Sequence, residues 1–184
     1  MKFALIAAVL AASIGTAAVA QDRSPDGSEP AVSFEPYFGV LGGYHNFDRR
    51  SEFGTVGSRG KMDGALIEGV AGVNVPLGPV FVGVEGVVAK GFKDIDWEYG
   101  VRGRVGMRAG QSGLIYASAG YQWVNGRKGF SDHKDMTYGL GVEVGPKEIG
   151  LGGLFGEAGP RLRLQADTYD FDSIRPMAGL VFAF

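Results

Sequence analysis

Charged side chains recur at every second position of one segment, and their spacing is the first sign of chemistry in the chain. Residues 97–109 read WEYGVRGRVGMRA. The even positions hold Glu98, Arg102, Arg104 and Arg108 with glycines between them, whereas the odd positions are apolar, aromatic or glycine. A period of two is typical of a β-strand with two different faces. We expect one face to form ion pairs or attract ions, and the other to contact an apolar environment.

Other segments with the same alternation add charges to the corresponding face. Together they supply six glutamates and five arginines: Glu35, Glu68, Glu85, Glu98, Glu143, Glu157, Arg102, Arg104, Arg108, Arg161 and Arg163. If the strands close into a barrel of eight, its interior is only wide enough for side chains to fill it. A charge buried there without a partner is costly. The set therefore predicts a salt-bridged, closed interior, and the alternative is the selectivity lining of a small pore.

The two histidines raise the question of catalysis or metal binding. The possible partners close in sequence are Asp48 and Ser51 for His45, and Ser131, Asp132 and Asp135 for His133. A serine, a histidine and an acid can form a nucleophilic site, and histidines with carboxylates can bind a metal. Nothing in these spacings fixes either geometry, and such residue types are common in loops. We therefore predict no catalytic site, no metal and no cofactor.

Eight alternating segments can position the charged side chains. Their expected bounds are 34–46, 63–75, 80–90, 97–109, 114–124, 136–144, 152–167 and 175–184. A tilted strand needs about 9–11 residues to cross a bilayer, and each of these segments, of 9 to 16 residues, is long enough to do so. Long polar connections alternate with tight turns such as PLGP at residues 76–79, a composition suited to turns. The expected fold is all-β, an eight-stranded antiparallel transmembrane up-and-down β-barrel over residues 34–184.

Aromatic residues on the apolar faces gather near the end that carries the long loops. The six are Tyr44, Trp97, Tyr99, Tyr121, Trp123 and Tyr138. Membrane barrels place such a girdle at the interface between lipid and water. A soluble β-sandwich has no reason to align its aromatics at one end, so the pattern favours the membrane barrel.

The N-terminal residues predict export. Lys2 is followed by an apolar run that ends in AVA at residues 18–20, which is typical of a cleaved signal peptide over residues 1–20. Residues 21–33, QDRSPDGSEPAVS, are polar and predict a flexible periplasmic leader. The absence of cysteine excludes disulfides and a lipid-anchored cysteine. The formal net charge of −2 is too balanced to suggest nucleic-acid binding.

Three features together resemble a known family: the signal peptide, the even number of alternating strands, and a final strand RPMAGLVFAF that ends in Phe184. The chain is similar to the small outer-membrane barrels of the OmpA-like and opacity-protein-like kind. The resemblance implies an outer-membrane location in a Gram-negative bacterium, with Phe184 as the signal that the barrel assembly machinery reads. It implies a monomer and says little about function, because this fold hosts several activities.

The resemblance leaves three functions open. The first is a non-enzymatic barrel that supports the envelope and displays loops for interaction or adhesion. The second is a narrow porin-like channel, and the third is an enzyme acting on lipid A. A lipid A deacylase would be expected to carry a His-x-Ser pair on an outward strand face, which neither histidine has. We therefore expect the first function.

Charges in the expected loops suggest a lipid partner. The basic residues there are Arg49, Arg50, Arg59, Lys61, Lys90, Lys93, Arg127, Lys128 and Lys134. Several of them could hold lipopolysaccharide phosphates beside the aromatic girdle; a solvated polar surface is the simpler interpretation. The last loop is instead acidic, with Asp167, Asp170 and Asp172, which suits a partner without naming one.

Overall fold

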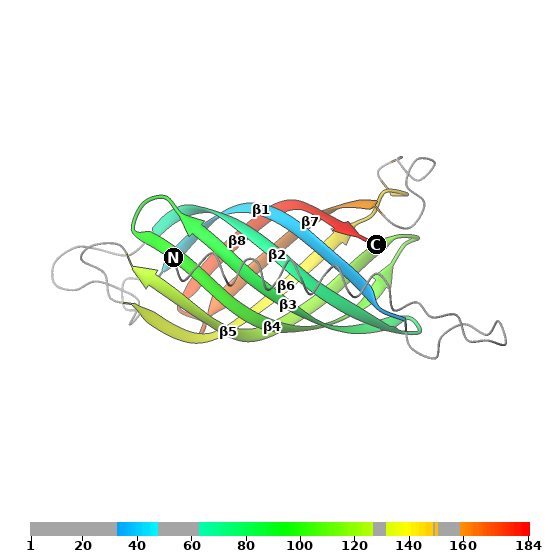
Figure 1. The fold of residues 1–184 in the computed structure, drawn as a ribbon, viewed down its shortest axis with the longest axis horizontal. Helices are drawn as coiled ribbons and strands as arrows, with labels where there is room; N and C mark the ends of the chain where they lie inside the picture. Colours follow the sequence, from blue (N-terminus) through cyan, green and yellow to red (C-terminus); the bar gives the residue numbers. More distant parts are fainter. Residues whose placement is uncertain (1–32, 48–62, 127–131, 149, 151–158) are drawn as a thin grey trace, which may run out of the picture.

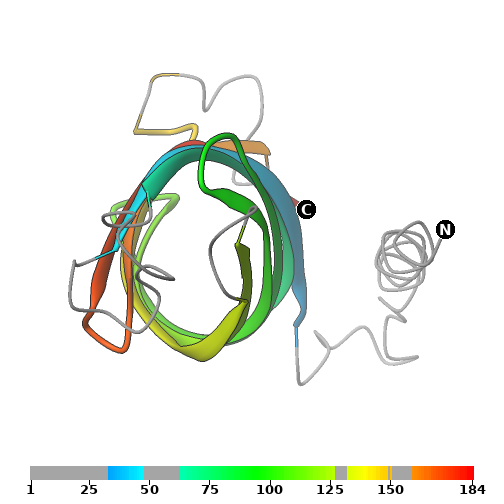
Figure 2. The same ribbon diagram turned by 90° about the vertical axis from the view of Figure 1, so that its left-hand side faces the viewer.

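The computed structural model describes residues 33–47, 63–126, 132–148, 150 and 159–184. They form eight antiparallel strands in which each strand pairs with its neighbours in sequence and the last pairs with the first, closing the barrel. The strands run obliquely along the barrel and form a closed ring when seen from one end (Figures 1 and 2). Their bounds are β1 Glu35–Phe47, β2 Asp63–Leu77, β3 Val80–Gly91, β4 Ile95–Ala109, β5 Gly113–Gly126, β6 His133–Val144, β7 Gly159–Tyr169 and β8 Ser173–Ala183. The predicted fold class is confirmed.

The alternation in the sequence becomes an alternation between the interior and the outer surface. In β4 the side chains of Arg102 and Arg104 are buried, whereas those of Tyr99, Val101 and Val105 are exposed. The distribution is the reverse of that in a soluble protein, where charged residues are almost never fully buried unless paired. An outer surface of this kind needs an apolar surrounding such as the membrane interior. No helix among the described residues has the length and apolarity to cross a membrane.

The barrel has two distinct ends. The loop end carries the connections after β1, β3, β5 and β7, and the turn end carries those after β2, β4 and β6 together with the C-terminal residue of β8. Gly78 and Gly110 adopt positive φ angles of 72° in the turns after β2 and β4, a conformation that glycine adopts without steric cost. In Figure 1 the red C-terminal strand β8 runs toward the turn end.

The seventh strand was expected over residues 152–167, after a short connection that starts at Gly145. The structure describes β7 from Gly159 to Tyr169, so its end lies two residues beyond the expected one. Residues 151–158, where the expected strand begins, lie outside the described residues. Residues 1–32, including the predicted signal peptide and nearly all of the leader, also lie outside the described residues.

Candidate functional site

A network of buried ion pairs fills the middle of the barrel. The Arg102 guanidinium on β4 contacts carboxylates from three other strands: Glu85 on β3 at 2.5 Å, Asp167 on β7 at 3.0 Å and Glu68 on β2 at 3.3 Å. All four side chains are at most 2% exposed. Because β4 and β7 are not neighbours in the ring, Arg102 ties the walls together through the interior.

A second group of arginines lies toward the turn end. Arg163 on β7 contacts Glu85 at 2.5 Å and Glu143 on β6 at 2.8 Å, and Arg104 on β4 contacts Glu143 at 2.7 Å. The Arg104 guanidinium also lies 3.8 Å from the centre of the Tyr116 ring, a geometry that adds cation–π attraction. Each carboxylate here serves at least two guanidinium groups, so the group acts as one unit.

Arg175 holds the part of the network nearest the loop end. Its side chain on β8 lies 2.8 Å from carboxylate oxygens of Glu68, Glu98 and Asp167. Glu98 is on β4, the strand opposite β8 in the ring. The contact again joins walls that share no backbone hydrogen bond.

His45 lies inside the barrel and not with the sequence neighbours considered for it. Its Nδ1 is 2.7 Å from Glu98 Oε1, and its Nε2 is 3.1 Å from Ser173 Oγ. Since the backbone N–H of Tyr169 donates to Ser173 Oγ at 3.1 Å, the hydroxyl is free to donate to Nε2. The arrangement is satisfied when a neutral His45 donates from Nδ1 to an ionised Glu98.

The order serine, histidine, acid is that of a hydrolase triad, but the surroundings do not suit catalysis. His45 and Glu98 are completely buried and Ser173 is 9% exposed. The His45 ring is stacked on Phe47 with centroids 3.9 Å apart, and Glu98 is held by Arg175 as well. A catalytic histidine and acid must be reachable from the substrate side, whereas His45 and Glu98 are held in the interior by these contacts. The chain of hydrogen bonds therefore joins β1, β4 and β8 as a structural element.

Within the described residues the buried network is balanced. Its carboxylates are Glu68, Glu85, Glu98, Glu143 and Asp167, and its cations are Arg102, Arg104, Arg161, Arg163 and Arg175. Five acids thus face five arginines. Electroneutrality without mobile ions is what a closed, salt-bridged interior requires.

The structure changes the membership predicted for this network. Asp167 was expected in an acidic surface loop, but β7 continues to Tyr169 and turns the Asp167 side chain inward. Arg175 and Asp167 were not predicted as interior residues. Both have odd residue numbers, as Arg161 and Arg163 do, and the odd-numbered side chains of β7 and β8 face the interior. Glu35 and Arg108 pair with each other at the turn end and are partly exposed, at 23% and 36%, so they form a rim pair outside the central network. Glu157 lies outside the described residues.

The aromatic residues expected at the interface point outward near the loop end. Tyr44, Trp97, Tyr99 and Tyr121 are exposed, and Trp123 and Tyr138 are half-buried. Trp123 stacks on Tyr99 with centroids 5.6 Å apart and meets Tyr121 edge-on at 5.0 Å. At the opposite end Phe184 is 63% exposed and stacks on Phe38.

The described cations of the loop end are only partly available to a ligand. Lys90 and Lys134 belong to β3 and β6, not to loops as expected. Lys90 pairs with Asp96 and lies 4.5 Å from the centre of the Trp97 ring, and Lys93 pairs with Asp63. The other predicted cations, residues 49, 50, 59, 61, 127 and 128, lie outside the described residues, as do residues 48, 51 and 131. No group of three or more potential metal ligands occurs in the part of the chain that the structure describes.

Comparisons with known proteins find similarity in structure alone. No protein-family model matches the chain, and no curated protein matches its sequence. Ail of Yersinia pestis, solved with the heparin analogue sucrose octasulfate, is 13% identical with a TM-score of 0.51, over 83% of this chain and 99% of Ail.

Two further solved structures are similar to this chain in fold. Neisserial surface protein A is 14% identical with a TM-score of 0.50, over 84% of this chain and 100% of that protein. The N-terminal barrel domain of Pseudomonas aeruginosa OprF is 12% identical with a TM-score of 0.50, over 82% of this chain and 97% of the domain. At such identities the similarity concerns the fold, and the fold is that of the small outer-membrane β-barrels.

Proposed function

We propose that this protein is an outer-membrane β-barrel with a closed interior, which supports the envelope and displays its loop end for surface interactions. The observation that carries the proposal is the set of ion pairs across the lumen, in which Arg102, Arg163 and Arg175 each contact at least two carboxylates. Such a network makes the barrel more rigid. Its charged side chains are paired with one another and are therefore not available to bind a permeating ion. A role without catalysis is part of the proposal, and the complete burial of His45 and Glu98 supports it.

The location and partners form part of the proposal. Export through a cleaved signal peptide, recognition of Phe184 by the barrel assembly machinery and a monomeric state follow the family that the chain resembles. Lipopolysaccharide phosphates are the proposed ligands of basic residues at the loop end. The complex of Ail with a sulfated sugar analogue is an example of an anionic ligand on a barrel of this fold.

A narrow channel is the second candidate, and one observation favours it. Several buried polar atoms at different levels of the barrel have no protein partner, among them Oε1 of Gln122, Oγ1 of Thr137 and Nε of Arg161. Buried polar groups are normally satisfied, and water that entered the barrel would satisfy these atoms. Water molecules at separate sites are compatible with a closed interior, whereas a continuous row of water molecules through the barrel would make a pore.

Planar-bilayer recording of the refolded barrel separates the two candidates. For the closed barrel we expect wild-type conductance equal to that of the lipid alone. The Arg163→Ala variant should leak ions, because it removes a cross-lumen cation, whereas Leu164→Ala on the outward side of the same strand should stay silent. Steady, ion-selective channels in the wild-type protein would establish the pore function instead.

A further inference from the structure

Arg161 is the buried arginine with the weakest set of partners. It lies on β7, two positions closer to the turn end than Arg163, and is 5% exposed. Among the residues that the structure describes, its one ionic contact joins Nη1 to Glu143 Oε2 at 3.6 Å, which is too long for a hydrogen bond. Its Nε is buried and has no hydrogen-bond partner among the same residues. The Arg161 guanidinium therefore lacks the acceptors that a buried charged group requires.

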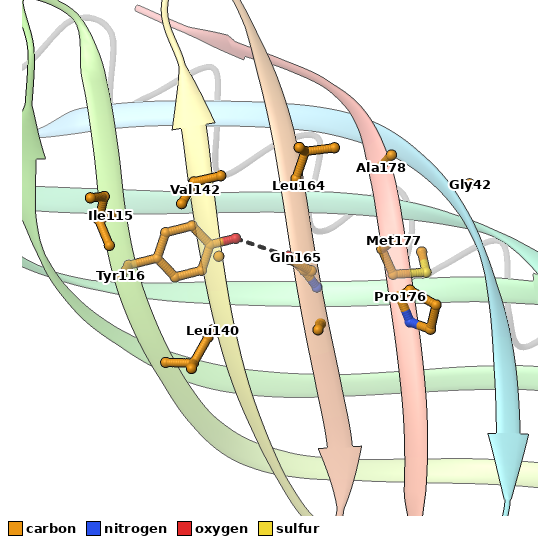
Figure 3. Close-up of a pocket in the computed structure, with 12 residues that line it drawn as sticks. Gly42, Ile115, Tyr116, Leu140, Val142, Leu164, Gln165, Pro176, Met177 and Ala178 are labelled. Carbon is orange, nitrogen blue, oxygen red and sulfur yellow. Dashed lines mark hydrogen bonds between the residues drawn. The ribbon is translucent and has the colours of Figure 1, made fainter.

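Arg104 on β4 brings a second guanidinium to the same carboxylate. Its Nη2 contacts Glu143 Oε1 at 2.7 Å, and its Cζ lies 3.8 Å from the centre of the Tyr116 ring. Figure 3 shows that the Tyr116 hydroxyl is engaged elsewhere, because it donates to Gln165 on β7 at 2.9 Å. Two more nitrogens of Arg104, Nε and Nη1, are buried without a hydrogen-bond partner in the described part of the chain. Arg104 and Arg161 thus share a shortage of acceptors.

The charges around these donors do not balance locally, although those of the whole network do. Three arginines contact the carboxylate of Glu143, namely Arg104, Arg161 and Arg163. The other acid in contact with this group is Glu85, which also serves Arg102. Three guanidinium groups therefore face one whole carboxylate and part of another. The turn-end part of the network carries a positive excess.

A small oxyanion has both the charge and the geometry that this part of the lumen lacks. A guanidinium presents parallel N–H donors in a planar fork, which matches two oxygens of a phosphate or a similar anion. Hydrogen bonds of this kind are strengthened by the low dielectric constant of a protein interior. Water would satisfy a donor but would supply no negative charge, and a cation would be repelled. The contacts therefore favour an anion over water or a cation.

We propose that the lumen binds one small inorganic oxyanion, such as phosphate, at its turn end. The guanidinium of Arg161 holds the ion, and Arg104 supplies further positive charge beside it. The oxyanion is a fixed counter-charge for the turn-end arginines and does not pass through the barrel. The proposal thus goes beyond the closed barrel of the proposed function without altering it.

A phosphorus NMR titration of the refolded protein with inorganic phosphate tests the proposal. The detergent should be non-ionic and free of phosphate, and sodium chloride should keep the ionic strength constant. We expect one phosphate per barrel, with a dissociation constant on the order of 1 mM from two charge-assisted hydrogen bonds. The midpoint of urea unfolding should rise with phosphate concentration, whereas chloride at the same ionic strength should not raise it.

Three arginine variants locate the ion. Arg161→Gln should weaken phosphate binding by about tenfold or more, because it removes the charge and the fork. Glu143 keeps Arg104 and Arg163 in this variant, so the barrel should still fold. Arg161→Lys keeps the charge without the fork and should bind with intermediate affinity. Arg108→Gln is the matched control, because it removes a cation from the partly exposed rim pair at the same end, and it should bind phosphate as the wild type does.

Four results would overturn the proposal. Absence of phosphate binding by the wild type would mean that no anion completes this part of the network. Unchanged affinity in Arg161→Gln, or an equal loss in Arg108→Gln, would place the phosphate elsewhere. Binding by Glu157→Gln but not by the wild type would show that a carboxylate of the chain itself is the counter-charge. None of these results depends on conductance, so a failure here is distinct from a failure of the closed-barrel proposal.

Discussion

The guanidinium of Arg163 on β7 lies 2.5 Å from the carboxylate of Glu85 on β3, and these strands stand four places apart in a closed ring of eight. The pair therefore spans the interior from wall to wall. Glu85 also lies 2.5 Å from Arg102 and accepts a hydrogen bond from the Tyr37 hydroxyl at 2.8 Å. One carboxylate thus joins side chains from β1, β4 and β7 to its own strand.

Replacing Glu85 should cost more stability than replacing any single acid at the rim. Glu85→Gln leaves three buried arginines, Arg102, Arg104 and Arg163, short of a counter-charge, and breaking a buried pair typically costs roughly 3–5 kcal/mol. Glu35→Gln removes the same group from the partly exposed pair with Arg108, for which we expect less than about 1 kcal/mol. Urea unfolding in lipid vesicles, followed by tryptophan fluorescence, measures both. Equal losses in the two variants would show that the cross-lumen pairs carry no special weight.

Acid should weaken the contact between the turn after β4 and the connection after β6. A hydrogen bond from the Ser112 hydroxyl, with backbone N–H donors of Ser112 and Gln111, lowers the pKa of Glu148 from 4.5 to about 2. A lowered carboxyl pKa stabilises the folded state above the ordinary value, and the contribution disappears as the pH falls from 4.5 toward 2.

The unfolding midpoint of Glu148→Gln should therefore lie below that of the wild type at neutral pH, by a small amount because the carboxylate is exposed. The two midpoints should converge as the pH falls through that window. Glu148→Asp keeps the charge but shortens the side chain. It therefore distinguishes the effect of the negative charge from that of the hydrogen bonds that the longer side chain makes. A difference that stays constant with pH would mean that the ionised form makes no contribution.

Labelling from outside the cell should reach the loop end alone. The chain contains no cysteine, so Lys134→Cys near the loop end and Gln111→Cys at the turn end each create a unique thiol. A membrane-impermeant maleimide added to intact cells should label the first and reach the second only after the outer membrane is opened. The opposite pattern would invert the proposed orientation.

Loss of Phe184 should reduce assembly more than stability. Its side chain stacks on Phe38 with centroids 5.6 Å apart, and its N–H donates to the Pro36 carbonyl at 3.1 Å. These contacts lie at the exposed rim, so we expect the detergent-refolded truncated barrel to unfold close to the wild-type midpoint. The amount in the outer membrane should fall several-fold, as measured by fractionation and heat-modifiable gel mobility. Phe184→Leu tests whether the aromatic ring itself is required, and normal membrane levels without residue 184 would contradict the assembly role.

The faces of the strands were predictable from sequence, whereas the partners across the lumen were not. A period of two assigns Arg102 and Val101 to opposite faces without reference to any other strand. The contact of Arg102 with Glu85 is also local, because these residues are direct partners in the register of β3 and β4. The contacts of Arg175 with Glu98 depend on how the ring closes and how far the strands tilt, and no short window of sequence contains that information.

The ends of the strands were also difficult to predict from sequence. Residues 167–172 read DTYDFD, and an acidic run of this kind is typical of a loop. The expected strand ended at residue 167, whereas the structure continues β7 to Tyr169 and buries the Asp167 carboxylate between Arg102 and Arg175. A charged residue that looks like loop composition is thus part of the interior, and only its odd position hinted at this.

The sharing of carboxylates within the network has a consequence for how the sequence can change over time. A charged interior residue cannot vary alone, since four of the five acids are each held by two or three arginines and Glu98 by Arg175 and His45. Each single loss leaves an unpaired charge in a low-dielectric space. The outward positions have no such ties, because any apolar side chain satisfies the membrane. We therefore expect single apolar substitutions on the outward face to be tolerated, whereas the interior charges should be replaceable only in compensating pairs.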